Sequence, residues 1–128
     1  MLKPLFFWLA TLWTLAIVFL CLAKFGSMPR VPLQNADKYV HFSFHFVFVV
    51  LWFLYFNSKK ENRINHNAIL KVFLMSFLFG FLIEIAQFLF TKTRGFDLLD
   101  VLANTTGAFV AALLIRLVQL LKVKKGYK

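Results

Sequence analysis

The feature that most constrains the fold of this chain is a set of four long apolar segments separated by short polar connections. They lie at about residues 4–23, 39–56, 72–90 and 98–121. A helix needs ~20 apolar residues to cross the hydrocarbon core of a bilayer, and each segment comes close to or reaches that length. The composition agrees, since 61% of the residues are hydrophobic. The sequence therefore predicts an all-α membrane protein, in which one domain over residues 1–128 forms a compact bundle of four transmembrane helices.

The net charge of +10 is best explained as a signal for membrane orientation. Cytoplasmic loops of membrane proteins carry an excess of Lys and Arg. With the N-terminus in the cytoplasm, ten Lys and Arg residues flank the spans on the inner side and five on the outer side. We therefore predict that both termini are cytoplasmic. No nucleic acid is expected as a partner, because the sequence contains no soluble domain to present a basic groove.

Cysteine usage and ligand spacing exclude several kinds of site. Cys21 is the single cysteine, so neither an internal disulfide nor a cysteine-based zinc site can form. A hydrated divalent cation could bind the carboxylates, but the sequence shows no established metal-ligand spacing. It therefore predicts no metal and no cofactor.

Three of the five carboxylates stand in the apolar run of residues 79–107, as Glu84, Asp97 and Asp100. With both termini cytoplasmic, all three fall at the outer side of the membrane, where the second span also begins. A charged carboxylate at the bilayer centre costs at least ~2.5–3.5 kcal/mol. Their position in this run therefore calls for a structural or functional reason.

Helical periodicity places the polar residues of each span on one edge. The stripe on the third span consists of Ser76, Gly80, Glu84, Gln87 and Thr91. The stripe on the fourth span consists of Asp97, Asp100, Asn104, Gly107, Ala108 and Ala111. The sector on the second span consists of Asp37, Lys38, His41 and His45. Because the three edges lie at the same depth, we expect them to face one another.

Two interpretations of these polar edges remain open. Interhelical hydrogen bonds between polar side chains fasten membrane helices, with about 0.6–2 kcal/mol for each bond, and Asp97 also stands where a helix N-cap is expected. However, Asn or Ser would fasten helices at a lower cost than ionisable groups. The number of ionisable groups therefore favours a functional site over a purely structural one.

The ionisable residues suggest separate chemical roles. Asp37, His41 and Glu84 are the candidate catalytic residues, because carboxylates and imidazoles can transfer protons. Lys38 and Arg94 are candidates for binding a phosphate or another anionic ligand. The residues expected to support them are His45, Gln87, Asp97, Asp100, Asn104 and Gly107.

These residues also form a recognisable series of motifs. Asp37-Lys38-x-x-His41-Phe42 is followed by Glu84-x-x-Gln87 and then by Arg94-x-x-Asp97-x-x-Asp100-x-x-x-Asn104-x-x-Gly107. The series resembles the VanZ-like family of small bacterial membrane proteins over residues 37–111. The chain departs from the family pattern where Thr91-Lys92-Thr93 replaces the frequent proline or glycine before the arginine, and where Ala111 replaces a second glycine.

The resemblance implies a multi-pass protein of the bacterial cytoplasmic (inner) membrane. The founding member of the family is associated with low-level resistance to teicoplanin, a lipoglycopeptide that acts on cell-wall precursors outside the membrane. This association agrees with a polar site that opens outward and that binds or acts on envelope lipid or a lipid-linked glycan precursor.

Two other functions fit the sequence. The small size of the chain suits a non-catalytic accessory subunit, with another membrane protein or a second copy as its partner. Intramembrane Glu and His also suit an ion- or proton-coupled transporter. Against transport, the ionisable groups cluster on one side of the membrane and no inverted repeat is visible.

Overall fold

A computed structural model describes residues 2–23, 36–58, 64–91 and 95–126 of the chain. Four α-helices follow one another: α1 (Leu2–Leu22), α2 (Ala36–Asn57), α3 (His66–Phe90) and α4 (Leu98–Gly126). All four are long and apolar enough to cross a membrane, and the described residues contain no strand. The predicted all-α architecture with four membrane-length helices is therefore confirmed.

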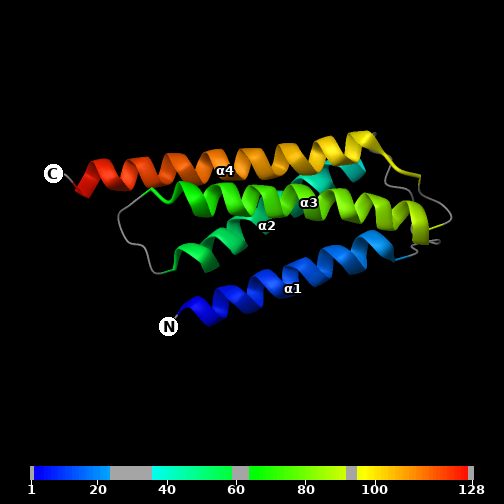
Figure 1. The fold of residues 1–128 in the computed structure, drawn as a ribbon, viewed down its shortest axis with the longest axis horizontal. Helices are drawn as coiled ribbons and strands as arrows, with labels where there is room; N and C mark the ends of the chain where they lie inside the picture. The colour runs from blue at the N-terminus through cyan, green and yellow to red at the C-terminus, as the bar shows by residue number, and fades with distance from the viewer. Residues whose placement is uncertain (1, 24–35, 59–63, 92–94, 127–128) are drawn as a thin grey trace.

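The helices run alternately up and down in a bundle (Figure 1). The most extensive contact is between α2 and α4, and α3 packs against both of them. Helix α1 packs on α2 and, over a smaller area, on α3. We call the end at which α2 and α4 begin the polar end, and the end at which α1 begins and α4 finishes the basic end.

Two helices extend beyond the apolar segments from which they were predicted. Helix α3 begins at His66, because the Asn65 side chain caps it by accepting a hydrogen bond of 3.2 Å from the Ala68 N–H. Helix α4 continues to Gly126, with Lys124 and Lys125 in its last turn. Lysine is a good helix former, and cations are favourable near the negative end of the helix dipole. Helix ends are thus set by capping and charge, whereas hydropathy marks only the membrane-embedded part.

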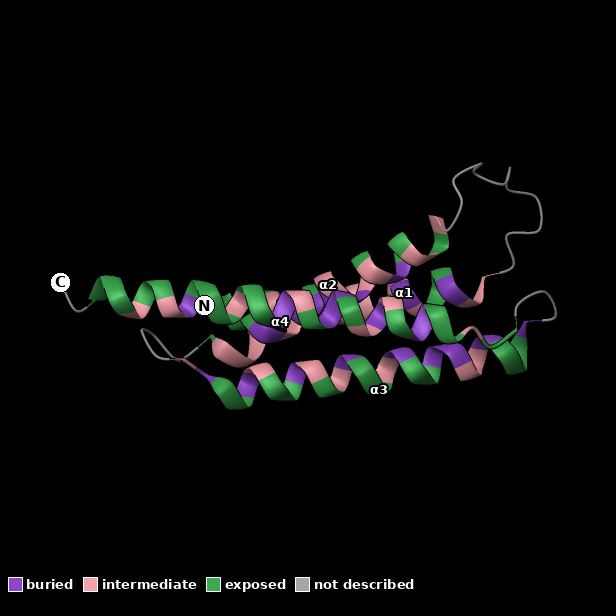
Figure 2. Ribbon diagram, turned by 90° about the horizontal axis from the view of Figure 1, so that it is seen from above, coloured by how far each residue is buried: buried purple, intermediate pink, exposed green. Residues whose placement is uncertain are grey.

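The bundle has a buried interior and an apolar exterior. Ile17, Val49 and Val72, from three different helices, are at most 1% exposed. The outward faces carry large hydrophobic side chains such as Phe19 and Phe90, which are 68% and 72% exposed. Buried residues therefore line the inner face of each helix and exposed residues cover the outside (Figure 2), where many of the side chains are large and hydrophobic. An apolar exterior of this kind suits a surface in contact with lipid.

Glycine allows α2 and α4 to approach closely. A Cβ atom on Gly107 would overlap the backbone carbonyl group of Phe42 and lie 2.9 Å from its carbonyl carbon. On α3, a Cβ atom on Gly80 would lie 2.9 Å from Cε1 of His45 and 3.1 Å from the Asn104 side chain. Small residues are favoured at membrane helix contacts for this reason. The two glycines thereby bring the polar edges of the three helices within bonding distance of one another.

Candidate functional site

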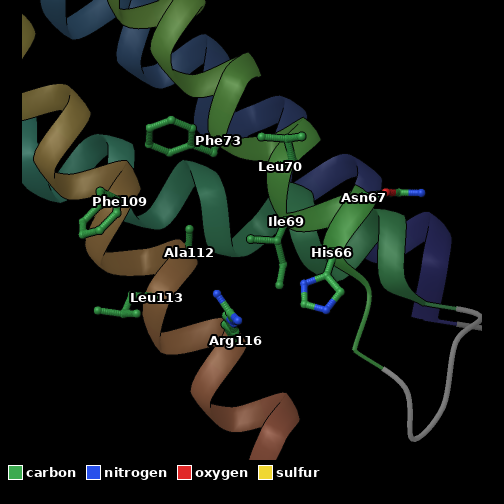
Figure 3. A pocket seen from close by; sticks show the side chains of 9 residues that line it. All are labelled: His66, Asn67, Ile69, Leu70, Phe73, Phe109, Ala112, Leu113 and Arg116. Atoms are coloured by element: carbon green, nitrogen blue, oxygen red, sulfur yellow. The ribbon is translucent and has the colours of Figure 1, made fainter.

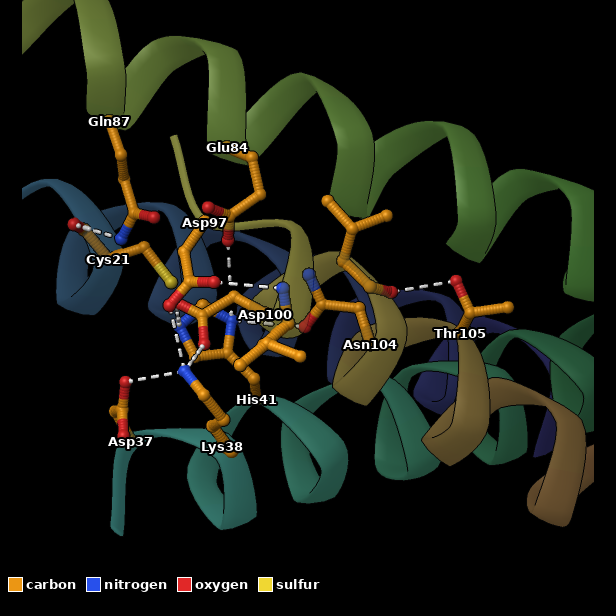
Figure 4. Close-up of polar contacts among 12 residues, drawn as sticks. Cys21, Asp37, Lys38, His41, Glu84, Gln87, Asp97, Asp100, Asn104 and Thr105 are labelled. Atoms are coloured by element: carbon orange, nitrogen blue, oxygen red, sulfur yellow. Dashed lines mark hydrogen bonds and ion pairs between the residues drawn. The ribbon is translucent and has the colours of Figure 1, made fainter. Parts of the chain in front are cut away.

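The polar ends of α2, α3 and α4 meet in one group of side chains, which we call the polar cluster. Its members are Asp37, Lys38, His41, Glu84, Asp97, Asp100 and Asn104 (Figure 4). They come from three helices and the residue before α4, and each contacts at least one other member. In the structure, polar side chains of α2, α3 and α4 therefore contact one another at this end of the bundle.

Lys38 is the cation at the outer part of the cluster. Its ammonium group donates hydrogen bonds to Asp100 Oδ1 at 2.7 Å, Asp97 Oδ2 at 2.9 Å and Asp37 Oδ2 at 3.2 Å. An ammonium group has three donors, and these three carboxylates use all of them. An anion could therefore bind Lys38 only by displacing a carboxylate.

Asp97 serves both the helix and the cluster. Its Oδ1 accepts the Leu99 N–H at 2.8 Å, and its backbone carbonyl accepts the Asp100 and Val101 N–H groups. Asp97 thus caps α4, as its position predicted. The hydrogen bond from Lys38, together with that from the Leu99 N–H, lowers the pKa of the Asp97 carboxyl below its ordinary value of 3.8. Asp97 is therefore an anion at neutral pH.

His41 lies at the centre of the cluster, one turn of α2 deeper than Lys38. Its Nδ1 lies 3.0 Å from Asn104 Oδ1 and 3.7 Å from Glu84 Oε1. Its Nε2 lies 3.7 Å from Asp100 Oδ2. The imidazole is thus placed between two carboxylates that belong to two other helices. This arrangement gives the inner part of the cluster groups that can accept, donate or relay a proton.

The inner part of the cluster is far more buried than the outer part. Glu84 is fully buried, and His41 and Asn104 are 4% and 2% exposed. By contrast, the side chains of Asp37 and Asp97 are 46% and 43% exposed. The cluster therefore extends from the surface at the polar end to the interior of the bundle.

Two predicted supporting residues make other contacts. His45 lies one further turn along α2, and its Nδ1 lies 2.8 Å from the hydroxyl oxygen of Ser76 on α3. Gln87 points toward α1, where its Nε2 donates to the backbone carbonyl of Cys21 at 2.9 Å. Both contacts fasten helices to each other. Gly107 contributes close packing, as described above.

Arg94, the second predicted anion-binding residue, lies outside the described residues. Glu61 and the residues Lys92 and Thr93 of the connection before α4 also lie outside them. The geometry of the candidate site is therefore known only for the predicted site residues other than Arg94.

A polar contact at the basic end was not foreseen. The Asn65 N–H donates to Gln119 Oε1, and Asn65 Nδ2 donates to Asn57 Oδ1, each at 3.2 Å. Gln119 is 7% exposed, so this contact joins α2, α3 and α4 at the end opposite the polar cluster. The single glutamine in the apolar sequence of α4 was the available signal for it.

A groove of about 390 Å³ lies between α3 and α4 near the basic end (Figure 3). Apolar side chains form most of its wall, among them Phe73 and Phe109, and His66 and Arg116 are its ionisable members. Its described lining residues include no carboxylate, and it lies apart from the polar cluster. Among the described residues, the groove therefore lacks the combination of acidic and basic groups found in the polar cluster.

Within the described residues, the polar cluster also has the donor atoms for a cation. One coordinating atom from each of His41, Glu84 and Asp100 lies within 4.8 Å of the other two, and the same holds for Asp37, Asp97 and Asp100. The first group combines an imidazole with two carboxylates and is buried throughout, whereas the second consists of carboxylates and is partly exposed.

Comparison with known proteins gives one result for the whole chain. Neither the curated proteins nor the solved structures contained a significant match. A sequence model of one family, VanZ/LLP1, matches residues 4–119. The match covers all four helices except their outermost residues and includes every described member of the polar cluster. The chain therefore belongs to the VanZ/LLP1 family.

Proposed function

We propose that the polar cluster binds the headgroup of an envelope lipid or lipid-linked glycan at the outer face of the bacterial inner membrane. The observation that carries this proposal is the convergence of Lys38, His41 and carboxylates from separate helices at one end of the bundle. Neutral side chains would fasten these helices at a lower cost than buried ionisable groups. A binding role supplies the reason for retaining charge there.

The distribution of basic residues supports the orientation. Described lysines and arginines near the basic end are Lys3, Lys71, Arg116, Lys122, Lys124 and Lys125. Lys38 is the one described basic residue at the polar end. Because short cytoplasmic segments are enriched in Lys and Arg, the basic end is assigned to the cytoplasm. The polar cluster then lies at the extracytoplasmic side, and both termini lie inside.

The charges of the described cluster favour a particular ligand chemistry. The described cluster contains four carboxylates and one lysine, and that lysine already donates to three of the carboxylates. Carboxylates accept hydrogen bonds from hydroxyl and ammonium groups. A sugar or an aminated headgroup therefore fits this part of the cluster better than a bare phosphate. Arg94 is the candidate for a phosphate of the same ligand.

Transport fits the arrangement less well. Among the described residues, His45 is the buried ionisable group that lies farthest from the polar end, and it contacts Ser76. The buried polar contact at the basic end consists of the neutral side chains Asn57, Asn65 and Gln119. A proton relay usually consists of a continuous series of titratable groups across the membrane. In the described helices this series is interrupted.

Lipid that co-purifies with the protein provides the test. Wild-type protein is extracted from its native membrane in mild detergent, and its bound lipids are quantified by mass spectrometry. We expect a specific headgroup class to be enriched at least tenfold over bulk membrane lipid. Glu84→Gln and Asp100→Asn should each reduce the enrichment to near the bulk level, because each replaces a carboxyl group of the site with an amide of the same shape.

Glu61→Gln is the matched control, because it makes the same substitution in the connection between the second and third spans. It should leave the enrichment unchanged. Size-exclusion profiles and melting temperatures identify variants that fail to fold. A lipid profile that is the same in wild type and in folded Glu84→Gln and Asp100→Asn variants would contradict the proposed site. Retention of a stoichiometric protein partner by all variants would instead favour an accessory subunit.

A further inference from the structure

We propose that His41, Glu84 and Asp100 bind one divalent transition-metal ion. The proposal concerns the inner part of the polar cluster and does not depend on the lipid ligand proposed above. The sequence alone predicts no metal, because the spacing of its ligand residues along the chain matches no known motif. The three residues come from three different helices, so a linear motif could not reveal them.

The distances between the donor atoms suit a shared ion. His41 Nε2 and Asp100 Oδ2 are 3.7 Å apart, which is too long for a hydrogen bond. Two ligands that each lie ~2.0–2.2 Å from one metal ion can be at most ~4.4 Å apart. Glu84 contributes a third donor, and the coordinating atoms of all three residues lie within 4.8 Å of one another. A small adjustment of side chains would bring all three to one ion.

Asn104 sets the imidazole in the orientation that a metal ligand requires. Its amide oxygen lies 3.0 Å from His41 Nδ1, and it accepts a hydrogen bond from this nitrogen in the tautomer that carries the proton on Nδ1. In this tautomer Nε2 presents its lone pair toward Asp100. Metal-binding histidines commonly donate their other ring N–H to a carbonyl or carboxylate in this way. The repulsion between this lone pair and the Asp100 carboxylate is relieved by a cation between them or by a second proton on the ring.

The two carboxylates are also arranged for coordination. Lys38 bonds to Oδ1 of Asp100, which leaves Oδ2 on the side of His41. Glu84 is fully buried and Asp100 is 7% exposed. Burial of a carboxylate is costly unless a cation or several hydrogen-bond donors compensate. A divalent ion between Glu84 and Asp100 would add to the compensation that Lys38 already gives Asp100.

A second buried group points to the same place. Asn104 is 2% exposed, and its Nδ2 has no hydrogen-bond partner among the described residues. A Cβ atom on Gly80 would lie 3.1 Å from this nitrogen, so the amide faces α3 one turn from Glu84. Buried amide groups normally have a partner. A water molecule or hydroxide bound to the ion would provide the acceptor for Nδ2.

The donor set favours a transition metal over magnesium or calcium. Imidazole suits zinc and iron, whereas magnesium and calcium prefer oxygen ligands alone. Three protein ligands with a fourth position for water is the usual composition of a catalytic zinc site. Such an ion would lower the pKa of its bound water and could contact a ligand oxygen in the same position.

Metal content and binding test the proposal. Protein carrying a tag without histidine is purified in detergent, stripped with a chelator and titrated with Zn²⁺ and, separately, Co²⁺. We expect one equivalent of Zn²⁺ to bind, and Mg²⁺ at a hundredfold excess to leave it in place. His41→Gln, Glu84→Gln and Asp100→Asn should each weaken Zn²⁺ binding at least tenfold. Co²⁺ should show visible absorption that these variants lose.

His66→Gln is the matched control, because His66 is an exposed histidine at the other end of the bundle. It should bind Zn²⁺ as the wild type does. Circular dichroism and size exclusion verify that each variant is folded, and Glu84→Asp provides a conservative change that should retain part of the binding. Binding lost through His66→Gln, or wild-type affinity in folded His41→Gln and Asp100→Asn variants, would overturn the proposal. Failure of the metal test would leave the lipid enrichment described above unaffected.

Discussion

At the scale of single residues, Lys38 balances the negative charge of the carboxylates at the polar end. Its ammonium group neutralises Asp100 deep in the cluster while it also contacts the more exposed Asp97 and Asp37. The Lys38 side chain is 20% exposed and that of Asp100 is 10% exposed. Ion pairs at such partial burial have stronger consequences when broken than surface pairs do. The contact with Asp100 is therefore the one with the greatest effect on stability.

Asp97 allows the capping and electrostatic roles of one residue to be separated. Asp97→Asn keeps an N-cap of similar strength but removes the charge opposite Lys38, while Asp97→Ala removes both. Because folding lowers the pKa of Asp97 below 3.8, its charge stabilises the protein fully above that value. This contribution disappears as the pH falls through the lower pKa of the folded state.

We therefore expect the wild type to be more stable than Asp97→Asn at pH 5–7, by less than about 1 kcal/mol for a pair this exposed. The difference should shrink as the pH falls below 3.8 and vanish once the pH lies below the lowered pKa of the folded state. Unfolding in detergent, followed by circular dichroism over this pH range, measures it. An unchanged difference at the lowest pH would show that Lys38 does not stabilise the Asp97 charge.

The sequence revealed the identity of these residues but not all their partners. Asp97 was recognisable as a cap because an apolar helix follows it directly. The sharing of Lys38 among three carboxylates was not predictable, because it depends on the rotation of α2 relative to α4. Gln87 shows the same limit: its burial followed from helical periodicity, but its contact with the Cys21 carbonyl depends on where α1 packs.

At the scale of helices, Gly107 determines the separation of α2 and α4. Gly107→Ala would force its Cβ against the Phe42 carbonyl group. Because backbone atoms cannot move aside as a flexible side chain can, we expect a loss of at least about 1–3 kcal/mol in the free energy of unfolding. Equilibrium unfolding in mixed detergent micelles measures this loss.

Gly126→Ala is the matched control in the same helix, because a Cβ atom there meets nothing within 4 Å. Alanine is a better helix former than glycine, so this variant should be as stable as the wild type or slightly more stable. Equal stability of the Gly107→Ala and Gly126→Ala variants would mean that α2 and α4 do not approach as closely as described.

Periodicity predicted the buried faces of the helices well. Ser76, Glu84 and Gln87 on α3 were expected on one stripe, and each is at most 1% exposed. The alternating phenylalanines of α2 resemble a strand pattern, yet the segment is helical. A helix satisfies its backbone hydrogen bonds internally, which an isolated strand in lipid cannot do. In this chain the requirement for internal backbone hydrogen bonds therefore favours a helix, although the alternating phenylalanines are typical of a strand.

At the scale of the whole molecule, hydropathy predicts the number of helices but not which helices pack against each other. Four apolar segments with short connections predict an up-and-down bundle. That α2 packs most extensively with α4 results from the glycine and alanine surface of α4, whose Gly107, Ala108 and Ala111 are all buried. The three-helix polar cluster is a consequence of that packing.

The most direct test of this account is a double-mutant cycle between Lys38 and Asp100, which belong to different helices. Free energies of unfolding are measured in detergent and chelator for the wild type, Lys38→Met, Asp100→Asn and the double variant. Lys38→Met alone should destabilise the protein by about 2–3 kcal/mol, because it leaves a buried carboxylate without its cation. The pair Lys38→Met and Gln119→Leu, at opposite ends of the bundle, serves as the control cycle.

If the acids and bases of α2 and α4 meet as described, Lys38 and Asp100 should show a coupling energy of about 1–3 kcal/mol, while the control pair adds within ~0.5 kcal/mol. Additive effects of Lys38→Met and Asp100→Asn, equal to those of the control pair, would contradict the polar cluster and every role assigned to it.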